Sequence, residues 1–493
     1  MKTSKAVIIC IYLLCNTFIL FLPVSKVSAE QDIKNTIDDY MKNFLEEHRI
    51  PGASMALVHE NEVVFSKAWG VTGESEERVT TETPFTLGSI SKSLTGLAII
   101  KLMEEGKVEL EDPVQTYLPW FTLEDPKATA QITIKHLLTH SSGISTYSGL
   151  LIADKESKDG SAIQKNVESL SNVKLTASPG EKYQYSNANF LILGALIEEV
   201  TNQTYSDYME QQVFLPLGMH HAAADNDRAY EKGYSAGYQS WFGIPRKSSV
   251  TYDNGGAPYG YITASAEDMV QYIKFLGQQH NRRFLTEHNM KLYLSPLFQT
   301  AENRYYGFGL RITNPESKDK MIWHSGSTPD SHTEMFFIPE TGWGGVILTN
   351  KNHILEEAAL PQLKQGIINI VNGEEPVAVP TYTPIVQLMT IAMICLLFVM
   401  SIYLLLKVKS VIIQKKKAWR SLGVILIVLA VIMIPLLTHG TGSPWHTIRV
   451  FAPDVALLAI ITAILLASNG LLSILISLKG RLSIKEETIP QIK

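Results

Sequence analysis

A serine followed three residues later by a lysine stands in the stretch GSISKSLTG, residues 88–96. Apolar residues at helical spacing come after it, so Ser89 is expected at the start of a helix with Lys92 nearly one turn further on. A serine hydroxyl becomes a strong nucleophile when a neighbouring base removes its proton, and a lysine with a lowered pKa can be that base. By itself, however, the pair fits a capped helix start with a solvated lysine better.

A second group of polar residues lies in PGEKYQYSNANF, residues 179–190, in a turn before a strongly helical pattern. If Tyr185 lies near Lys92, its phenolate could act as a base. Asn187 could then hydrogen-bond a substrate amide. Taken alone, this stretch fits a capping turn with a half-buried tyrosine better.

A third group, WHSGSTPD at residues 323–330, comes just before the last predicted pair of strands. We expect His324 and Ser325 on an edge strand, where Gly326 would let the backbone approach a ligand closely. The N–H of Ser327 could pair with the N–H of Ser89 to form an oxyanion hole. The alternative is an ordinary histidine in a loop.

The elements that would position these groups belong to a domain spanning residues 30–372. Residues 53–70 predict two strands around a turn at Glu60–Glu62, and residues 333–350 predict a second pair with Gly342 in its turn. A helix is expected over residues 353–371 despite an interrupting Pro361. The patterns between the two ends are mostly helical. We therefore predict an α/β (α+β) domain whose antiparallel sheet comes from both chain ends and carries an inserted helical region.

In their order, the three groups resemble the motifs of the serine β-lactamase and penicillin-binding-protein superfamily, in its class C-like branch. The same resemblance is carried by the stretches TPFTLGSISKSLTG, ITIKHLLTHSSGI, PGEKYQYSNANFLILG, VFLPLGM and YITASAEDMVQYIKF. It covers roughly residues 32–372 and implies a β-lactamase/transpeptidase-like fold. The layout with a membrane anchor also resembles FmtA-like serine hydrolases of Gram-positive bacteria.

The resemblance implies that Ser89 forms an acyl-enzyme while Lys92 and Tyr185 shuttle protons. It further implies a substrate-binding set and an oxyanion hole: Asn187, His324, Ser325 and Gly326 for the substrate, and the N–H groups of Ser89 and Ser327 for the oxyanion. β-Lactamases usually have lysine where this chain has His324, and many relatives of the H-x-G type have glycine at the position of Asp330. Because histidine is mostly neutral at pH 7, the first departure favours ester or D-amino-acid substrates over efficient β-lactam hydrolysis.

Both ends of the chain are strongly apolar. Residues 1–29 have the layout of a secretory signal peptide, with an uncleaved anchor as the alternative. A linker at residues 373–384 precedes three apolar runs, which we predict to be transmembrane helices: residues 385–406, 422–437 and 455–478. The connection KVKSVIIQKKKAWR carries six basic residues and no acidic one, so it is expected in the cytoplasm and the domain outside. The spans have no charged centre, which favours an anchoring role.

Charge and cysteine content exclude several kinds of site. A formal net charge of −5 gives no basic surface for nucleic acid. The three cysteines all lie in apolar segments, so the domain has neither disulfides nor a zinc–thiolate site. His136 and His140 are spaced like zinc ligands, but the intervening glutamate is missing. We expect no metal and no cofactor.

The sequence thus predicts a penicillin-binding-protein-like serine hydrolase that acts on D-alanyl peptides or D-alanyl or acyl esters of the cell envelope. The alternatives are a β-lactam-binding or sensing membrane protein with little turnover, and a weak class C-type β-lactamase. The expected partners are the envelope substrate and the membrane, the latter through the C-terminal helices, with no nucleic acid and no predictable protein partner. The expected location is the cell membrane of a Gram-positive bacterium, multi-pass, with the catalytic domain extracellular.

Overall fold

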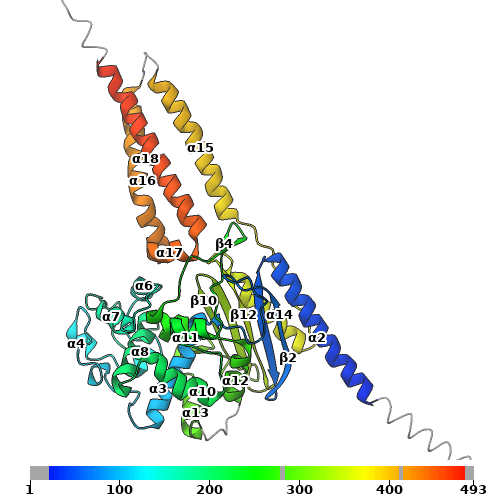
Figure 1. Cartoon of the computed structure of the whole chain (residues 1–493). Helices are drawn as coiled ribbons and strands as arrows, with labels where there is room; N and C mark the ends of the chain where they lie inside the picture. The colour runs from blue at the N-terminus through cyan, green and yellow to red at the C-terminus, as the bar shows by residue number, and fades with distance from the viewer. Residues whose placement is uncertain (1–21, 278–283, 410–414, 483–493) are drawn as a thin grey trace, which may run out of the picture. The chain divides into compact units, whose positions relative to one another are not determined.

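The computed structural model describes residues 22–277, 284–409 and 415–482, which divide into two compact units (Figure 1). The smaller unit joins α2 (Leu22–Glu47) to α14 (Leu360–Val371). The two helices approach closely at Gly366, which has no side chain. A Cβ atom at this position would lie 2.2 Å from the Tyr40 hydroxyl oxygen. Most of the predicted signal peptide lies outside the described residues, and its cleavage site stays a prediction.

The larger unit, Pro51–Glu357 with Thr383 onward, is built on an eight-stranded antiparallel sheet. The strands follow one another across the sheet in the order β2 (Glu62–Gly70), β1 (Gly52–His59), β12 (Trp343–Thr349), β11 (Ser331–Ile338), β10 (Met321–Thr328), β9 (Leu310–Thr313), β8 (Arg304–Gly307) and β7 (Phe298–Ala301). The first strands of the chain therefore pair with the last ones, as the sequence predicts.

Both predicted hairpins are confirmed. Glu60 and Asn61 have positive φ angles of 49° and 68°, which is the geometry of a tight turn whose twist matches that of the strands. Gly342, with φ of 70°, does the same between β11 and β12. The helix expected from residue 353 begins only at Leu360, so that prediction is wrong at its start. Pro361 stands in the first turn of α14, where its missing N–H costs nothing.

Helices fill the inserted region between β2 and β7. The longest are α3 (Ser91–Glu104), α8 (Asn187–Thr201) and α12 (Ala266–Gly277), and α12 packs on β1 and β12. The shorter helices are α4 (Pro126–Thr129), α5 (Ile134–Leu138), α6 (Thr146–Leu151), α7 (Ala162–Glu168), α9 (Tyr205–Met209), α10 (Leu215–Leu217), α11 (Asn226–Glu231) and α13 (Glu287–Tyr293). Two small sheets accompany them: β3 (Phe85–Thr86) with β6 (Thr263–Ala264), and β13 (Lys351–Asn352) with β4 (Tyr238–Trp241) and β5 (Ile244–Lys247). The buried core runs through α3, α8 and the inner face of the sheet.

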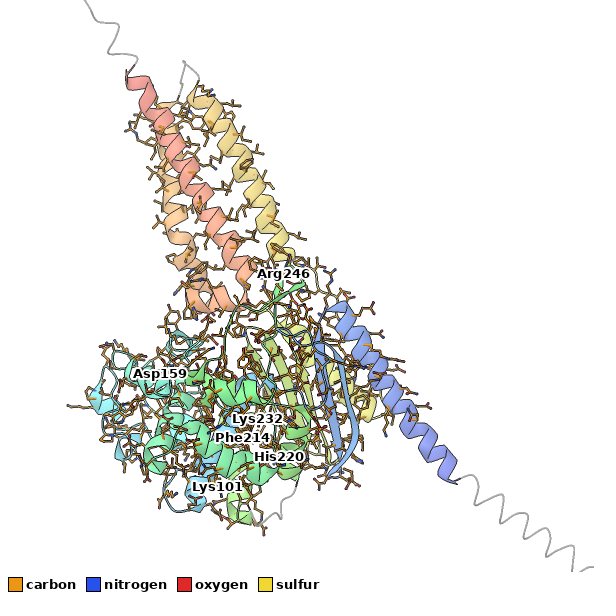
Figure 2. All side chains as sticks on the ribbon, viewed as in Figure 1. Lys101, Asp159, Phe214, His220, Lys232 and Arg246 are labelled. Atoms are coloured by element: carbon orange, nitrogen blue, oxygen red, sulfur yellow. The ribbon has the colours of Figure 1, made fainter. Side chains whose placement is uncertain are left out.

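Three helices near the C-terminus are long and apolar enough to cross a membrane. They are α15 (Ile385–Val408), α16 (Lys416–Thr441) and α18 (Pro453–Leu482), and large apolar side chains project from them along their length (Figure 2). Gly423 and Gly470 let α16 and α18 pack backbone to backbone, as small residues do in membrane bundles. A short helix between them, α17 (Trp445–Phe451), was not predicted from the sequence.

Candidate active site

Ser89 lies in a short 3₁₀ turn, η1 (Gly88–Ile90), directly before α3. The turn needs Gly88, because its φ of 53° is left-handed and a Cβ there would lie 2.2 Å from Ser327 N. Lys92 follows on the first turn of α3 and donates hydrogen bonds to Ser89 Oγ at 2.9 Å and to the Tyr259 carbonyl at 2.8 Å. The structure therefore brings together the two residues that the sequence paired.

Lys92 is fully buried, whereas the Ser89 side chain remains partly open to the cleft. Burial lowers the pKa of Lys92 well below its usual value, and the neighbouring Arg311 cation lowers it further. Removal from water disfavours the ammonium form, so the neutral amine is populated at lower pH than in an exposed lysine. A neutral amine within 2.9 Å of the Ser89 hydroxyl can accept its proton.

Tyr185 precedes α8 and faces the same lysine. The Lys92 nitrogen lies 4.9 Å from the centre of the Tyr185 ring. Burial raises the pKa of Tyr185 above its usual value, although the Arg311 cation opposes this shift. Tyr185 is therefore a neutral phenol in the resting site, suited to relaying a proton. Its role as a standing phenolate, which the sequence allowed, is disfavoured by this burial.

His140 supports the tyrosine from behind. Its ring centre lies 4.2 Å from that of Tyr185. The His140 Nδ1 accepts hydrogen bonds from the Ser186 N–H at 3.2 Å and from the Asn189 amide at 2.9 Å. The Nδ1 of His136 accepts from the Thr133 N–H at the start of α5. Both histidines of the HLLTH stretch thus have a visible structural task.

His324 lies on β10, which the sequence predicted as an edge strand. β10 is flanked by β9 and β11, but β9 pairs only with Met321–Trp323, so the edge is open from His324 onward. The His324 Nδ1 donates to the Ser325 carbonyl at 2.6 Å, and its Nε2 lies 3.2 Å from the Tyr306 hydroxyl. A backbone carbonyl can only accept, so His324 Nδ1 carries a proton.

Arg311 supplies a cation that the sequence analysis missed. It lies opposite Trp323 in the register of β9 and β10, and its guanidinium stacks over the rings of Tyr185, Tyr306 and Trp323 at 5.5–5.8 Å. Its buried Nε–H has no acceptor among the residues that the structure describes. The only sequence signal is one basic residue inside the apolar strand pattern of YGFGLRIT.

The backbones of η1 and β10 are in close contact beside Ser89. A Cβ on Gly326 would stand 1.9 Å from the Leu87 carbonyl and 2.7 Å from Ser89 N. No other residue type permits such an approach. The N–H groups of Ser89 and Ser327 are consequently held on the two segments that come into contact.

The Ser327 side chain is held in place by a hydrogen bond to His332. Its hydroxyl lies 2.9 Å from His332 Nδ1, while His332 Nε2 donates to the Glu334 carboxylate at 3.1 Å. In the turn after β10, Asp330 accepts from the Gly237 N–H at 3.0 Å and from the Thr328 hydroxyl at 3.2 Å. This buried carboxylate fixes the turn where the chain has no glycine.

A cleft of about 320 Å³ joins these groups. From the sheet and the inserted helices it is lined by Ser89, Leu150, Asp154, Tyr185, Asn187, Tyr259, Gly260, Tyr261, Arg311, His324, Ser325, Ser327, Thr328, Ile354 and Glu357. Of the predicted site residues, Ser89, Tyr185, Asn187, His324, Ser325 and Ser327 line this one cavity. Lys92 and Gly326 do not line it; Lys92 reaches it through its hydrogen bond to Ser89. A nucleophile, a buried amine, a phenol, a pair of N–H donors and a cation are the parts needed for acyl transfer.

Comparison with known proteins gives the same picture. The family model described as Beta-lactamase matches residues 37–365. Protein flp of Staphylococcus aureus (strain NCTC 8325 / PS 47) is 27% identical over 468 residues, covering 92% of each chain. Penicillin-binding protein 4* of Bacillus subtilis (strain 168) is 27% identical over 356 residues, 69% of this chain and 77% of its own.

A solved structure shares the fold. It is the octameric penicillin-binding protein homologue from Pyrococcus abyssi, with a TM-score of 0.60 and 24% sequence identity. The match covers 70% of this chain and 78% of that one.

Proposed function

This chain belongs to the beta-lactamase family, and on that premise we propose that it is a penicillin-binding-protein-like serine hydrolase. Its substrates are D-alanyl peptides or D-alanyl or acyl esters of the cell envelope, and Ser89 carries the acyl group. The observation that carries this proposal is the 2.9 Å contact between Ser89 Oγ and the fully buried Lys92 amine. A lysine is almost never fully buried unless it is paired with an acidic group.

Acylation begins when the Ser89 proton passes to Lys92 as Oγ attacks the carbonyl carbon of the substrate. The carbonyl oxygen takes up the electron pair and is stabilised by the N–H groups of Ser89 and Ser327. The bond to the leaving group then breaks. The leaving group takes a proton from Lys92 by way of the Tyr185 hydroxyl, and the acyl group stays on Ser89. Water repeats the same steps and releases the acid.

Arg311 narrows the range of substrates. A guanidinium with an unpaired Nε–H, lining the cleft beside Tyr185, binds a carboxylate or another anion. The free carboxylate of a D-alanyl peptide is one anion of suitable size, and we assign its binding to Arg311, with Asn187, Ser325 and Gly326 along the cleft.

The test uses the full chain in lipid vesicles and an active-site fluorophosphonate. Wild type is expected to form one adduct, which mass spectrometry locates at Ser89. Ser89→Ala is expected to form none. Ser91→Ala is the matched control, since that hydroxyl only accepts from the Ile262 N–H at 3.2 Å. An unlabelled but folded wild-type chain would contradict the proposal.

Turnover then separates the alternatives. The same preparation is given a D-Ala-D-Ala peptide, a D-alanyl ester, a short acyl ester and a chromogenic β-lactam. Release of D-alanine or acid supports the hydrolase. A stable penicillin adduct without turnover would favour a binding or sensing protein, and rapid opening of the β-lactam a β-lactamase.

We further propose that the protein crosses the membrane several times. Residues Pro51–Glu357, called the catalytic part below, then lie outside a Gram-positive cell. Two observations support this orientation. The basic residues Lys415, Lys416, Lys417 and Arg420 lie at the start of α16. The catalytic part contacts the membrane helices at the opposite end of α16, through α17 (Figure 1).

A further inference from the structure

The short helix α17 links two apolar helices, yet it also binds the catalytic part. His446 Nε2 donates to the Asp154 carbonyl at 2.7 Å, and the Gln239 amide donates to the Val450 carbonyl at 2.7 Å. The N–H of Ile354 donates to the Phe451 carbonyl at 3.0 Å. Three segments that are far apart in the sequence therefore hydrogen-bond to α17, which is only seven residues long.

A buried charged group secures the same junction. Asp454, the second residue of α18, lies 2.8 Å from His353 Nε2, and both side chains are fully buried. The same carboxylate accepts from the Phe242 N–H at 2.9 Å and from the Gln387 amide of α15 at 3.2 Å. A buried carboxylate with so many donors is fixed in place, because separating it from them would leave it unpaired.

α17 forms a wall of the cleft that contains Ser89. Its residues Thr447 and Phe451, together with Ser443 just before it, line that cavity. The Thr447 side chain is only 4% exposed, and its hydroxyl has no hydrogen-bond partner among the described residues. Buried hydroxyls are nearly always paired, so the Thr447 hydroxyl is available to hydrogen-bond a group that enters the cavity.

This end of the cleft differs chemically from the end at Arg311. Leu150, Ile354 and Phe451 line it, and Ile354 is 46% exposed. Leu151 of α6, next to Leu150 in the sequence, and Leu355, next to Ile354, are also exposed large apolar residues. α17 connects the end of α16 to the start of α18. In the proposed topology these are the outer ends of the two helices, which places the apolar end of the cleft beside the membrane surface.

We propose that α17 is part of the substrate site and that the cleft takes an acyl donor carried on a lipid of the outer leaflet. The reacting acyl group lies at Ser89, the Thr447 hydroxyl binds the polar link behind it, and the lipid passes along Leu150 and Phe451. This inference rests on the proposed function and extends it, because it names where the donor comes from and what contacts its remote end.

The test compares one acyl donor in two forms. The full chain in phosphatidylglycerol vesicles is given the D-alanyl ester of glycerol in solution, or the same ester on diacylglycerol in the bilayer. We expect kcat/KM for the lipid-linked ester to exceed that for the soluble one by about tenfold or more, because the membrane raises its effective concentration at the cleft. Fluorophosphonate labelling of Ser89 is measured in parallel.

The variants are Thr447→Val, which removes only the hydroxyl, and Phe451→Ala. Phe451→Ala is expected to lower kcat/KM for the lipid-linked ester by about fivefold and that for the soluble ester less, because only the first carries a lipid. Thr447→Val is expected to lower both by about fivefold, because both esters have the polar link. Thr462→Val is the matched control, a buried threonine of α18 whose hydroxyl donates to the Leu458 carbonyl at 2.8 Å. Equal rates on both esters, or no effect of either variant, with labelling intact would overturn this inference alone. Loss of labelling in wild type would overturn the proposed function as well.

Discussion

The cation of Arg311 should control the pH at which Ser89 reacts. Lys92 must be neutral to accept the serine proton, so acylation rises with pH through the pKa of Lys92. Burial lowers that pKa most, and Arg311 lowers it further. In Arg311→Met the second contribution is lost, the pKa of Lys92 rises, and the acidic limb of the profile moves to higher pH.

The size of this shift follows from the geometry. Lys92 Nζ lies 4.9 Å and Arg311 Cζ 5.5 Å from the centre of the same Tyr185 ring, so the two charges are at most about 10 Å apart. With an effective dielectric constant of about 20, the repulsion is at least about 1.7 kcal/mol. At about 1.4 kcal/mol per pKa unit, the limb should move by about one pH unit.

The assay is the rate of Ser89 labelling by an uncharged fluorophosphonate between pH 5 and 9. An uncharged probe separates this effect from anion binding. Arg311→Lys should keep the wild-type limb, because it keeps the charge. Arg304→Met, at an exposed position of β8, is the matched control. If the limb of Arg311→Met coincides with that of Arg304→Met in a protein of unchanged thermal stability, the assignment of Lys92 as the base is refuted.

Two further variants test packing. Gly326→Ala should abolish labelling, because the new Cβ would stand 2.7 Å from Ser89 N, whereas Gly260→Ala in the same cleft should label normally, since nothing lies within 4 Å of its Cβ. His353→Ala removes one of the hydrogen-bond donors to the buried Asp454 carboxylate and should lower the free energy of unfolding by about 1.5–3 kcal/mol. Thermal unfolding in detergent measures this cost, with His439→Ala at an exposed position as the control; equal melting temperatures for the two histidine variants would contradict it.

Much of the fold and part of the site could be predicted from local sequence patterns. The turns at Glu60 and Gly342 could be predicted because a tight turn makes its demands within a few residues. The spacing of Ser89 and Lys92 likewise fixes their distance on a helix start. The order of the three motifs, through the resemblance it carries, led to the family.

What the sequence did not reveal depends on register and long-range packing. Arg311 reaches the cleft only because β9 pairs with β10 with Arg311 opposite Trp323. The burial of Tyr185, which disfavours a phenolate, comes from rings that lie far apart along the chain. α17 was missed because seven residues in a mostly polar connection have no clear periodicity. Pro361 was misjudged since a proline interrupts a helix or begins one according to where the first turn falls.

In the proposed membrane topology, the hydrogen bonds to α17 limit the distance that Ser89 can move from the membrane. A domain attached only by the extended residues 375–384 could swing through about 30 Å, the contour length of ten residues. In the proposed membrane topology, the hydrogen bonds to Val450, Phe451 and Asp454 remove that freedom and keep Ser89 at a fixed distance from the lipid surface. The enzyme can then act only on envelope substrates that reach Ser89 at that distance from the membrane.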